Sequence, residues 1–256
     1  MTRWVPVLAI VVVFAAVPGC GSDHESGPTA SAGAKIVVFA AASLKKSFTE
    51  IGEQFSKDTP GASVEFSFAG SADLLTQLTQ GARADVFASA DTRNMVKAAE
   101  AGLLAADPVN FASNTLTIAV APGNPKEITG FGDLSRPGLN VVVCAPQVPC
   151  GSAAQKLETD TGLTLNPVSE ESSVTDVLNK VSSGQADAGL VYVTDSAAAG
   201  AKVTAVPFPE AAGAVNTYPI ATLEQAGNPA LARKFVDLVT GSDGQQILAG
   251  AGFGKA

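Results

Sequence analysis

Serine-rich segments stand at the start of four helix-like stretches of this sequence. The residues concerned are Ser43, Ser71, Cys150-Gly151-Ser152 and Ser172-Ser173. The first turn of a helix leaves backbone N–H groups without partners and carries a partial positive charge of roughly half a unit. Four such turns converging on one point would sum to about +2 and would match a dianion without help from Lys or Arg. Serine is also a preferred N-cap of any helix, so capping alone is the competing explanation at each position.

The elements that would position these serines form two α/β blocks. The first block predicts strands at Lys35–Ala40, Val64–Phe68 and Asp85–Ala88, separated by helices that end at Pro60-Gly61 and Gly81. This alternation of strand and helix predicts a parallel sheet. In parallel α/β units, the turns that precede the helices lie at the carboxyl ends of the strands, where ligands bind.

The second block begins after Asn114. The strands predicted in it are Leu116–Val120, Leu139–Cys144, Ala188–Val193, Val203–Val206 and Tyr218–Leu223. Helices are predicted over Ser152–Asp160 and Val174–Val181, and a last helix opens at Asn228-Pro229 with Asn as the cap. Because no long linker separates the blocks, we expect two lobes that share crossover segments.

The N-terminus has the pattern of an export signal. Arg3 precedes an apolar run, Val5–Val17, which has the length of a signal peptide core and is short for a membrane span. Val17-Pro18-Gly19-Cys20 then resembles a bacterial lipobox, in which Cys20 becomes the lipidated N-terminus. The alternative is an ordinary secretory signal with an unrelated cysteine. We expect a signal peptide over residues 1–19 and a flexible tether over residues 20–33.

Composition narrows the possible partners and cofactors. The net charge of −8 disfavours nucleic acids, which require basic surfaces. The single histidine, His24, falls in the tether, so the folded part has no histidine to act as a base or a metal ligand. Cys144 and Cys150 remain after Cys20 and, outside the cytoplasm, are expected to form a disulfide, with two buried thiols as the alternative.

Several motifs, in order along the chain, resemble the periplasmic molybdate-binding proteins of molybdate ABC importers. They are Phe39-Ala40-Ala41-Ala42-Ser43-Leu44, Phe68-Ala69-Gly70-Ser71, Ala84-Asp85-Val86-Phe87, Val148-Pro149-Cys150-Gly151, Ser173-Val174 and Ala188-Gly189-Leu190-Val191-Tyr192. The similarity runs from Lys35 to the Gly252-Phe253-Gly254 tail. No single motif is decisive, but the ordered set is specific.

The resemblance implies a ligand set of five residues. Ser43 and Ser71 would each give a hydroxyl and a backbone N–H to the oxyanion, and Tyr192 would give its phenolic O–H. Cys150 and Val174 would contribute backbone N–H groups only. The family commonly has Ala where this chain has Cys150, a difference that leaves the backbone N–H unaffected. Molybdenum would be bound only as the oxyanion at these residues, and no cofactor is expected.

The resemblance also implies a two-lobed periplasmic-binding-protein fold of type II. Each lobe would be a mostly parallel sheet flanked by helices. We expect lobe I to contain residues 34–114 and 216–256, and lobe II to contain residues 115–215. Segments near Asn114–Leu116 and Pro207–Asn216 would form the hinge. The protein would be a monomer, lipid-anchored to the outer face of the cytoplasmic membrane, and would deliver its ligand to an ABC-type permease.

The predicted ligand is molybdate, and tungstate is expected to bind similarly because it is nearly the same size. Sulfate or another tetrahedral oxyanion is the alternative, although sulfate is smaller and would meet the donors loosely. Phosphate carries a proton at neutral pH, which a site made only of donors would leave unpaired.

Other functions are weaker readings of the same residues. Ser43-Leu44-Lys45-Lys46 fits the S-x-x-K pattern of serine β-lactamases and penicillin-binding proteins, but the chain lacks their S-D-N and K-T-G motifs. Arg83 and Arg93 are expected on the surface rather than at an amino-acid carboxylate. The acidic residues Asp85, Asp91, Asp187 and Asp195 are expected to serve as caps and hinge contacts. We therefore predict a binding protein and not an enzyme.

Overall fold

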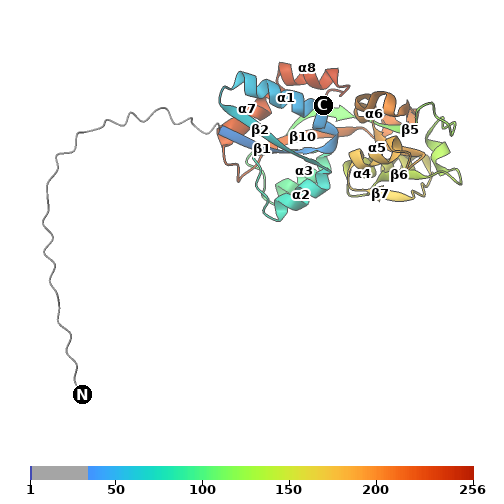
Figure 1. Ribbon diagram of the computed structural model, residues 1–256, viewed down its shortest axis with the longest axis horizontal. Coiled ribbons are helices and arrows are strands. Elements are labelled where there is room, and N and C mark those ends of the chain that lie inside the picture. Colours follow the sequence, from blue (N-terminus) through green and yellow to red (C-terminus); the bar gives the residue numbers. More distant parts are fainter. Residues whose placement is uncertain (2–33) are drawn as a thin grey trace. The chain divides into compact units, whose positions relative to one another are not determined.

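Two five-stranded sheets form the framework of the protein (Figure 1). The computed structural model describes residue 1 and residues 34–256. The predicted signal peptide, the tether and Cys20 lie outside the described residues. None of the helices within residues 34–256 combines the length and the apolar character needed to cross a bilayer.

The first sheet has the order β2-β1-β3-β10-β4. Its strands are β1 (Ala34–Ala41), β2 (Ala62–Ala69), β3 (Val86–Ala88), β4 (Val109–Asn114) and β10 (Asn216–Thr222). β1 pairs in parallel with β2 and β3, as the alternation of strand and helix predicts. β10 runs antiparallel to both β3 and β4, so the sheet contains one reversed strand.

The second sheet has the order β7-β6-β8-β5-β9. Its strands are β5 (Leu116–Val120), β6 (Val141–Cys144), β7 (Ser169–Glu171), β8 (Ala188–Tyr192) and β9 (Thr204–Val206). β6 pairs in parallel with β7 and β8, whereas β5 runs antiparallel to β8 and β9. The chain passes from the first sheet to the second through Thr115 and returns through residues 207–215.

Helices cover both faces of the first sheet. The helices of this part are α1 (Lys45–Asp58), α2 (Ser71–Thr79), α3 (Thr92–Glu100), α7 (Pro229–Thr240) and α8 (Ser242–Gly250). One core joins α1, α7 and α8 to one face, while a separate core joins α2 and α3 to the other. Successive side chains of β1 point to opposite faces of the sheet. Val38 therefore belongs to the first core and Phe39 to the second.

The apolar stripe of α1 shows how sequence spacing positions this helix. Phe48, Ile51 and Phe55 recur at helical spacing and are buried. The rings of Phe48 and Phe55 pack against Phe235 of α7 with centroids 6.0 and 5.5 Å away. Each buried side chain of this size contributes about 1.5–3 kcal/mol, so α1 is held firmly and the segment before it, which carries Ser43, has a fixed place.

The second sheet carries α4 (Pro149–Thr161), α5 (Val174–Ser182) and α6 (Val193–Ala199). Short 3-10 turns complete the chain: η1 (Ala42–Leu44), η2 (Phe131–Ser135), η3 (Gly200–Lys202) and η4 (Pro209–Gly213). The core of this part is continuous from Leu116 to Ala214 and includes Cys144, Cys150, Val174 and Tyr192.

Some elements differ from the sequence prediction. The third helix starts at Pro149 and not at Ser152, because proline at the first helical position already has the required φ angle and needs no N–H partner. The helix capped by Asn228 is not the last one, since α8 follows it. The first residues of α8 are rich in Gly, Ser and Asp and so resemble a loop. The sequence analysis also missed four elements: β4, β7, α3 and α6. β7 is only three residues long, and α6 is alanine-rich, so neither has a clear apolar periodicity.

Candidate functional site

A small cavity lies where the helix starts of the two sheets face each other. All five predicted site residues line it: Ser43, Ser71, Cys150, Val174 and Tyr192. Its volume, taken as the space open to the centre of a water molecule, is about 10 Å³. That is room for roughly one water, so the two walls are nearly in contact. None of the described residues that line the cavity carries a charge.

The first wall presents two serine hydroxyls that do not cap helices. Ser71 is the first residue of α2, whose N-cap is Gly70, and its Oγ accepts a hydrogen bond from the N–H of Ala90 at 3.0 Å. Ser43 lies in η1, and its Oγ is 3.0 Å from the hydroxyl of Tyr218. Both serines are buried. Capping, the competing explanation for these serines, therefore does not account for either side chain.

Capping does account for the fourth serine segment. The side chain of Ser173 accepts a hydrogen bond from the N–H of Asp176, as an N-cap of α5 does. The next residue, Val174, is the first of α5, and its N–H has no partner within the helix. Cys150 occupies the second position of α4 and is in the same situation.

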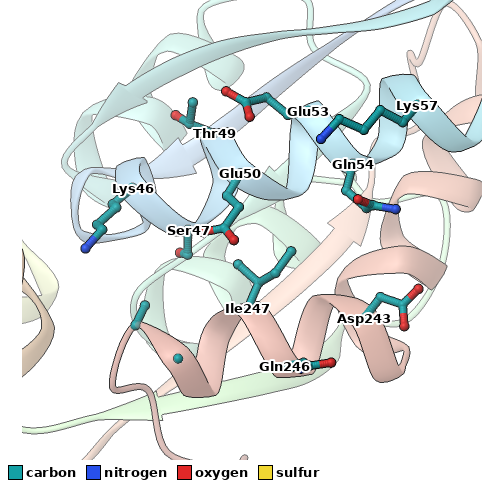
Figure 2. A pocket seen from close by; sticks show the side chains of 12 residues that line it. Lys46, Ser47, Thr49, Glu50, Glu53, Gln54, Lys57, Asp243, Gln246 and Ile247 are labelled. Carbon is teal, nitrogen blue, oxygen red and sulfur yellow. The ribbon is translucent and has the colours of Figure 1, made fainter.

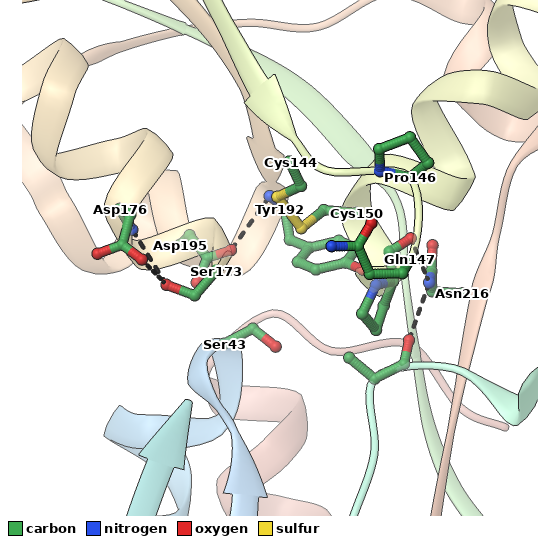
Figure 3. Close-up of a disulfide and its surroundings, with 12 residues drawn as sticks. Ser43, Cys144, Pro146, Gln147, Cys150, Ser173, Asp176, Tyr192, Asp195 and Asn216 are labelled. Atoms are coloured by element: carbon green, nitrogen blue, oxygen red, sulfur yellow. Dashed lines mark hydrogen bonds between the residues drawn. A yellow bond between two sulfur atoms is a disulfide. The ribbon is translucent and has the colours of Figure 1, made fainter. Parts of the chain in front are cut away.

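A disulfide joins Cys144, the last residue of β6, to Cys150 (Figure 3). Both cysteines are buried. The link ties the end of the strand to the first turn of α4 and so limits how far the N–H of Cys150 can move. The tight turn also requires Gly151, because a Cβ there would lie 2.0 Å from the carbonyl oxygen of Ala145.

Tyr192 supplies the one polar side chain of the second wall. It ends β8, and its N–H donates to the carboxylate of Asp195 at 3.1 Å. Its hydroxyl is buried and has no hydrogen-bond partner among the described residues. Burial raises the pKa of Tyr192 well above its usual value, so the group remains a phenol. An unpaired buried hydroxyl costs about 1–3 kcal/mol, which indicates that this O–H is arranged for an acceptor that enters the cavity.

Tyr218 was not among the residues predicted for the site. This residue of β10 is completely buried, and its ring lies edge-on to that of Tyr192 with centroids 6.0 Å apart. Burial, with the charge of Asp195 as the next cause, raises the pKa of Tyr218 far above the usual tyrosine value. The one available signal was that the chain has only two tyrosines, and both are here.

Two asparagines hold the segments that connect the sheets. Asn114 donates from its side-chain amide to the hydroxyl of Thr194 at 2.8 Å. Asn216 donates to the carbonyl oxygens of Ala90 at 2.8 Å and Pro149 at 3.4 Å, one on each side of the cavity. These contacts fix the relative position of the two walls in the structure.

Of the four aspartates expected to be caps and hinge contacts, Asp91 and Asp195 bond to the start of a helix. Asp85 and Asp187 accept from other backbone N–H groups and lie outside the caps and the hinge segments. Asp91 caps α3, and Asp85 accepts from the N–H groups of Val37 and Asn228. Asp187 accepts from the N–H of Asn140 and pairs with Lys126 at 3.5 Å. The carboxyl of Asp195 is buried, and burial raises its pKa from 3.8 to about 7.

Neither Arg83 nor Arg93 lines the cavity. Arg83 is exposed. Arg93 donates to the carbonyl oxygen of Pro146 at 3.0 Å and approaches Asp91 at 3.7 Å, so it bridges the two parts of the molecule beside the cavity.

Larger hollows exist, but neither of the two described next brings the five predicted residues together. A groove of about 900 Å³ runs between α1 and α8 and is lined mainly by charged and amide side chains (Figure 2). A second hollow of about 620 Å³ reaches Ser43 from the side of α6 and contains Lys45, Lys46 and Asp195. Within residues 34–256 no three His, Cys, Asp or Glu side chains are grouped as metal ligands.

Known proteins resemble the chain over its length. The family model of bacterial extracellular solute-binding proteins matches residues 36–254. The molybdate-binding protein ModA of Mycobacterium tuberculosis is 58% identical over 260 residues, covering 99% of each chain.

Solved structures resemble the chain in fold. The periplasmic molybdate-binding protein of Azotobacter vinelandii aligns with a TM-score of 0.74 at 23% identity, covering 85% of this chain and 98% of its own. The sulfate-binding protein SubI of M. tuberculosis aligns with a TM-score of 0.73 at 22% identity, covering 86% of both chains. The predicted binding-protein fold is thus confirmed, and the chain belongs to the family of bacterial extracellular solute-binding proteins, among the molybdate-binding ModA proteins.

Proposed function

We propose that the protein captures molybdate outside the cytoplasm and delivers it to an ABC-type permease. The observation that carries this proposal is the buried hydroxyl of Tyr192, which has no hydrogen-bond partner within residues 34–256 and lies in a cavity with the hydroxyls of Ser43 and Ser71. The 58% identity to a protein named for molybdate binding supports the choice of ligand.

The donors suit an anion that carries two charges and no protons. The proposed ligand set is Ser43, Ser71, Cys150, Val174 and Tyr192. The side chains of the first two and the last give O–H groups, while backbone N–H groups at helix starts add donors and a favourable dipole. Hydrogen bonds to charged groups contribute about 1.5–3 kcal/mol each. No ion pair has to be broken when the ligand leaves for the permease.

The closed walls imply a moving part. A tetrahedral oxyanion is larger than one water, so it enters when the walls separate and is enclosed when they meet. We propose lobes of residues 34–114 with 216–256 and of residues 115–215, hinged near Thr115 and at residues 207–215. The closed form would be the one that the permease recognises.

The fold leaves the choice of oxyanion open, since the sulfate-binding relative aligns about as well as the molybdate-binding one. The choice of molybdate therefore rests on the donor set and on the sequence identity. Tungstate is proposed to bind similarly because of its size, and sulfate to bind less tightly.

A serine hydrolase is the distant alternative, and the surroundings of Ser43 speak against it. Its hydroxyl pairs with Tyr218, whereas Lys46 of the S-x-x-K pattern is exposed and lines the outer grooves. We therefore propose that the protein works by binding and closure, without catalysis.

Calorimetry of the purified protein with molybdate, tungstate, sulfate and phosphate tests the assignment. Molybdate and tungstate should bind with similar affinity, sulfate far more weakly, and phosphate least. Tight sulfate binding without molybdate binding would overturn the ligand assignment. Hydrolysis of a chromogenic β-lactam would support the enzyme alternative.

We also propose that Cys20 carries the lipid anchor and that the protein is a monomer. In cells, Cys20→Ser should release the protein from the membrane fraction, whereas the native sequence should remain membrane-bound. Retention of the variant would indicate another form of attachment. Light scattering of the purified protein should give the mass of one chain.

A further inference from the structure

Different neighbours decide whether the hydroxyls of Ser43 and Ser71 donate or accept hydrogen bonds. The oxygen of Ser71 accepts from the N–H of Ala90, a group that can only donate, so the Ser71 hydrogen is left for another acceptor. The oxygen of Ser43 faces the hydroxyl of Tyr218 at 3.0 Å, and either atom could be the donor. Ser43 is therefore a donor to the cavity only if Tyr218 donates to it.

The surroundings of Tyr218 favour that direction. Its side chain is fully buried, so its hydroxyl cannot turn to bulk water. The side chains of Asn114 and Tyr192 lie near the Tyr218 hydroxyl, but among residues 34–256 only Ser43 Oγ has the distance and angle of a hydrogen bond to it. If Ser43 instead donated to Tyr218, the Tyr218 hydrogen would lose that acceptor, at a cost in free energy that buried unpaired donors always carry.

We propose that Tyr218 is a positioning residue that holds the Ser43 hydroxyl as a donor to the anion and thereby selects oxyanions that carry no proton. The proposal rests on the proposed function, because it concerns the same cavity. A bare dianion accepts the Ser43 hydrogen without disturbing the pair. A hydrogen-bearing oxyanion would need Ser43 as an acceptor, and this would reverse the Ser43–Tyr218 bond.

The burial of both tyrosines is consistent with this arrangement. Each has its pKa raised by burial, so each stays protonated and able to donate across the neutral range. With Ser71 held by Ala90 and Ser43 by Tyr218, both serines present hydrogens to the cavity. Removing the Tyr218 hydroxyl would leave Ser43 Oγ free to accept a hydrogen bond, and it would delete none of the proposed ligand groups.

The test is Tyr218→Phe, with affinities measured for molybdate and for arsenate, a tetrahedral oxyanion that carries at least one proton at neutral pH. Molybdate should bind about threefold to tenfold more weakly, because Ser43 is no longer oriented. Arsenate should bind as before or more tightly. The ratio of the two affinities should therefore fall by at least about threefold. An equal loss for both anions would overturn the proposal and leave Tyr218 with a packing role.

A double-variant cycle separates orientation from packing. In a Ser43→Ala background, Tyr218→Phe should change molybdate affinity by less than about twofold, since the hydroxyl that it orients is gone. Losses that multiply would contradict the proposal. Phe253→Leu is the matched control, because the Phe253 ring packs edge-on against the Tyr218 ring with centroids 5.4 Å apart and has no hydrogen-bonding group. This control should change both affinities by the same factor.

The experiments distinguish a wrong ligand assignment from a wrong role for Tyr218. If the unaltered protein does not bind molybdate, the proposed function is wrong. If it binds molybdate and Tyr218→Phe leaves the affinity ratio unchanged, only the role of Tyr218 is wrong.

Discussion

Gly70 and Ser172 meet beside the cavity, where the two walls approach each other, at a distance that no side chain at residue 70 would permit. A Cβ added to Gly70 would lie 2.0 Å from the carbonyl oxygen of Ser172, which belongs to the backbone and cannot rotate away. Gly70 precedes α2 on the first wall, and Ser172 precedes α5 on the second. The absence of a side chain at residue 70 therefore sets how closely the two walls approach.

Gly70→Ala should keep the walls apart. We expect at least a tenfold loss of molybdate affinity, because donors on opposite walls would no longer reach the anion together. Small-angle scattering should show that the variant fails to contract on adding molybdate. Gly130→Ala is the control, since a Cβ there meets nothing within 4 Å, and its affinity and contraction should match the native protein. Normal contraction of Gly70→Ala would contradict the steric argument.

Tyr192→Phe should separate stability from binding. The hydroxyl has no partner among the described residues, so its removal should leave the free energy of unfolding without ligand unchanged or raise it by up to about 1–3 kcal/mol. Molybdate affinity should fall by about tenfold or more, since one donor to a charged ligand is lost. Denaturant unfolding and calorimetry measure the two effects. A destabilised variant with native affinity would place the hydroxyl outside the site.

Ser71→Ala should weaken molybdate binding by about 1.5–3 kcal/mol, the range for a hydrogen bond to a charged group. Ser173→Ala is the matched comparison, because Ser173 caps α5 through its side chain. The Ser173 variant should lose about 1 kcal/mol of stability and much less affinity. Calorimetry of both variants checks the distinction, and similar affinity losses would mean that the site extends to the Ser173 hydroxyl.

Removing the disulfide should lower stability more than affinity. Cys144 and Cys150 close a loop of sequence separation 6, for which the chain-entropy model predicts about 2 kcal/mol. The Cys144→Ala, Cys150→Ala double variant should unfold at lower denaturant concentration and still bind molybdate, because Cys150 is proposed to act through its N–H. Reduction of the native protein provides the control. Complete loss of binding in the double variant would assign the disulfide a direct role in shaping the site.

Asp195 should make stability depend on pH. Its folded pKa of about 7 lies above the ordinary value of 3.8, so between these limits the folded state holds more protons than the unfolded state. The stabilisation is thus fully present below about pH 4 and is lost as pH rises to about 7. Asp195→Asn keeps an oxygen for the N–H of Tyr192 and should remove this slope, so denaturant titrations from pH 4 to 8 should be flatter. An identical slope in the variant would assign the effect to another group.

Much of the fold followed from periodicity. The buried strands β1 and β5 have strong apolar patterns, and their predicted ranges agree with the structure to within a few residues. The helix α1 ends at Asp58, just before the predicted end at Pro60-Gly61. The reversed strand β10 could not be assigned a neighbour, because its position between β3 and β4 depends on contacts across more than a hundred residues. The helix α8 was missed because its opening residues favour a loop, and packing against α1 and α7 overrides that local preference.

The chemistry of the site was readable only in part. The positions of Ser43, Ser71, Cys150, Val174 and Tyr192 came from ordered motifs, and the structure gathers all five around one cavity. The sequence could not distinguish capping serines from serines that face the cavity, since both stand at helix starts. Hydrogen-bond partners decide this: Ala90 and Tyr218 engage Ser71 and Ser43, whereas Ser173 bonds its own helix.

By itself, then, the sequence determined the α/β class, the helix starts and the types of donor available, because local periodicity and residue chemistry are properties of short segments. The tertiary structure alone decided which donors face one another, how closely Gly70 lets the walls approach, and that Tyr218 stands behind Ser43. Gly70 and Ser172 are 102 positions apart in the chain, and Ser43 and Tyr218 are 175 positions apart. Only the packing of whole sheets brings such residues together.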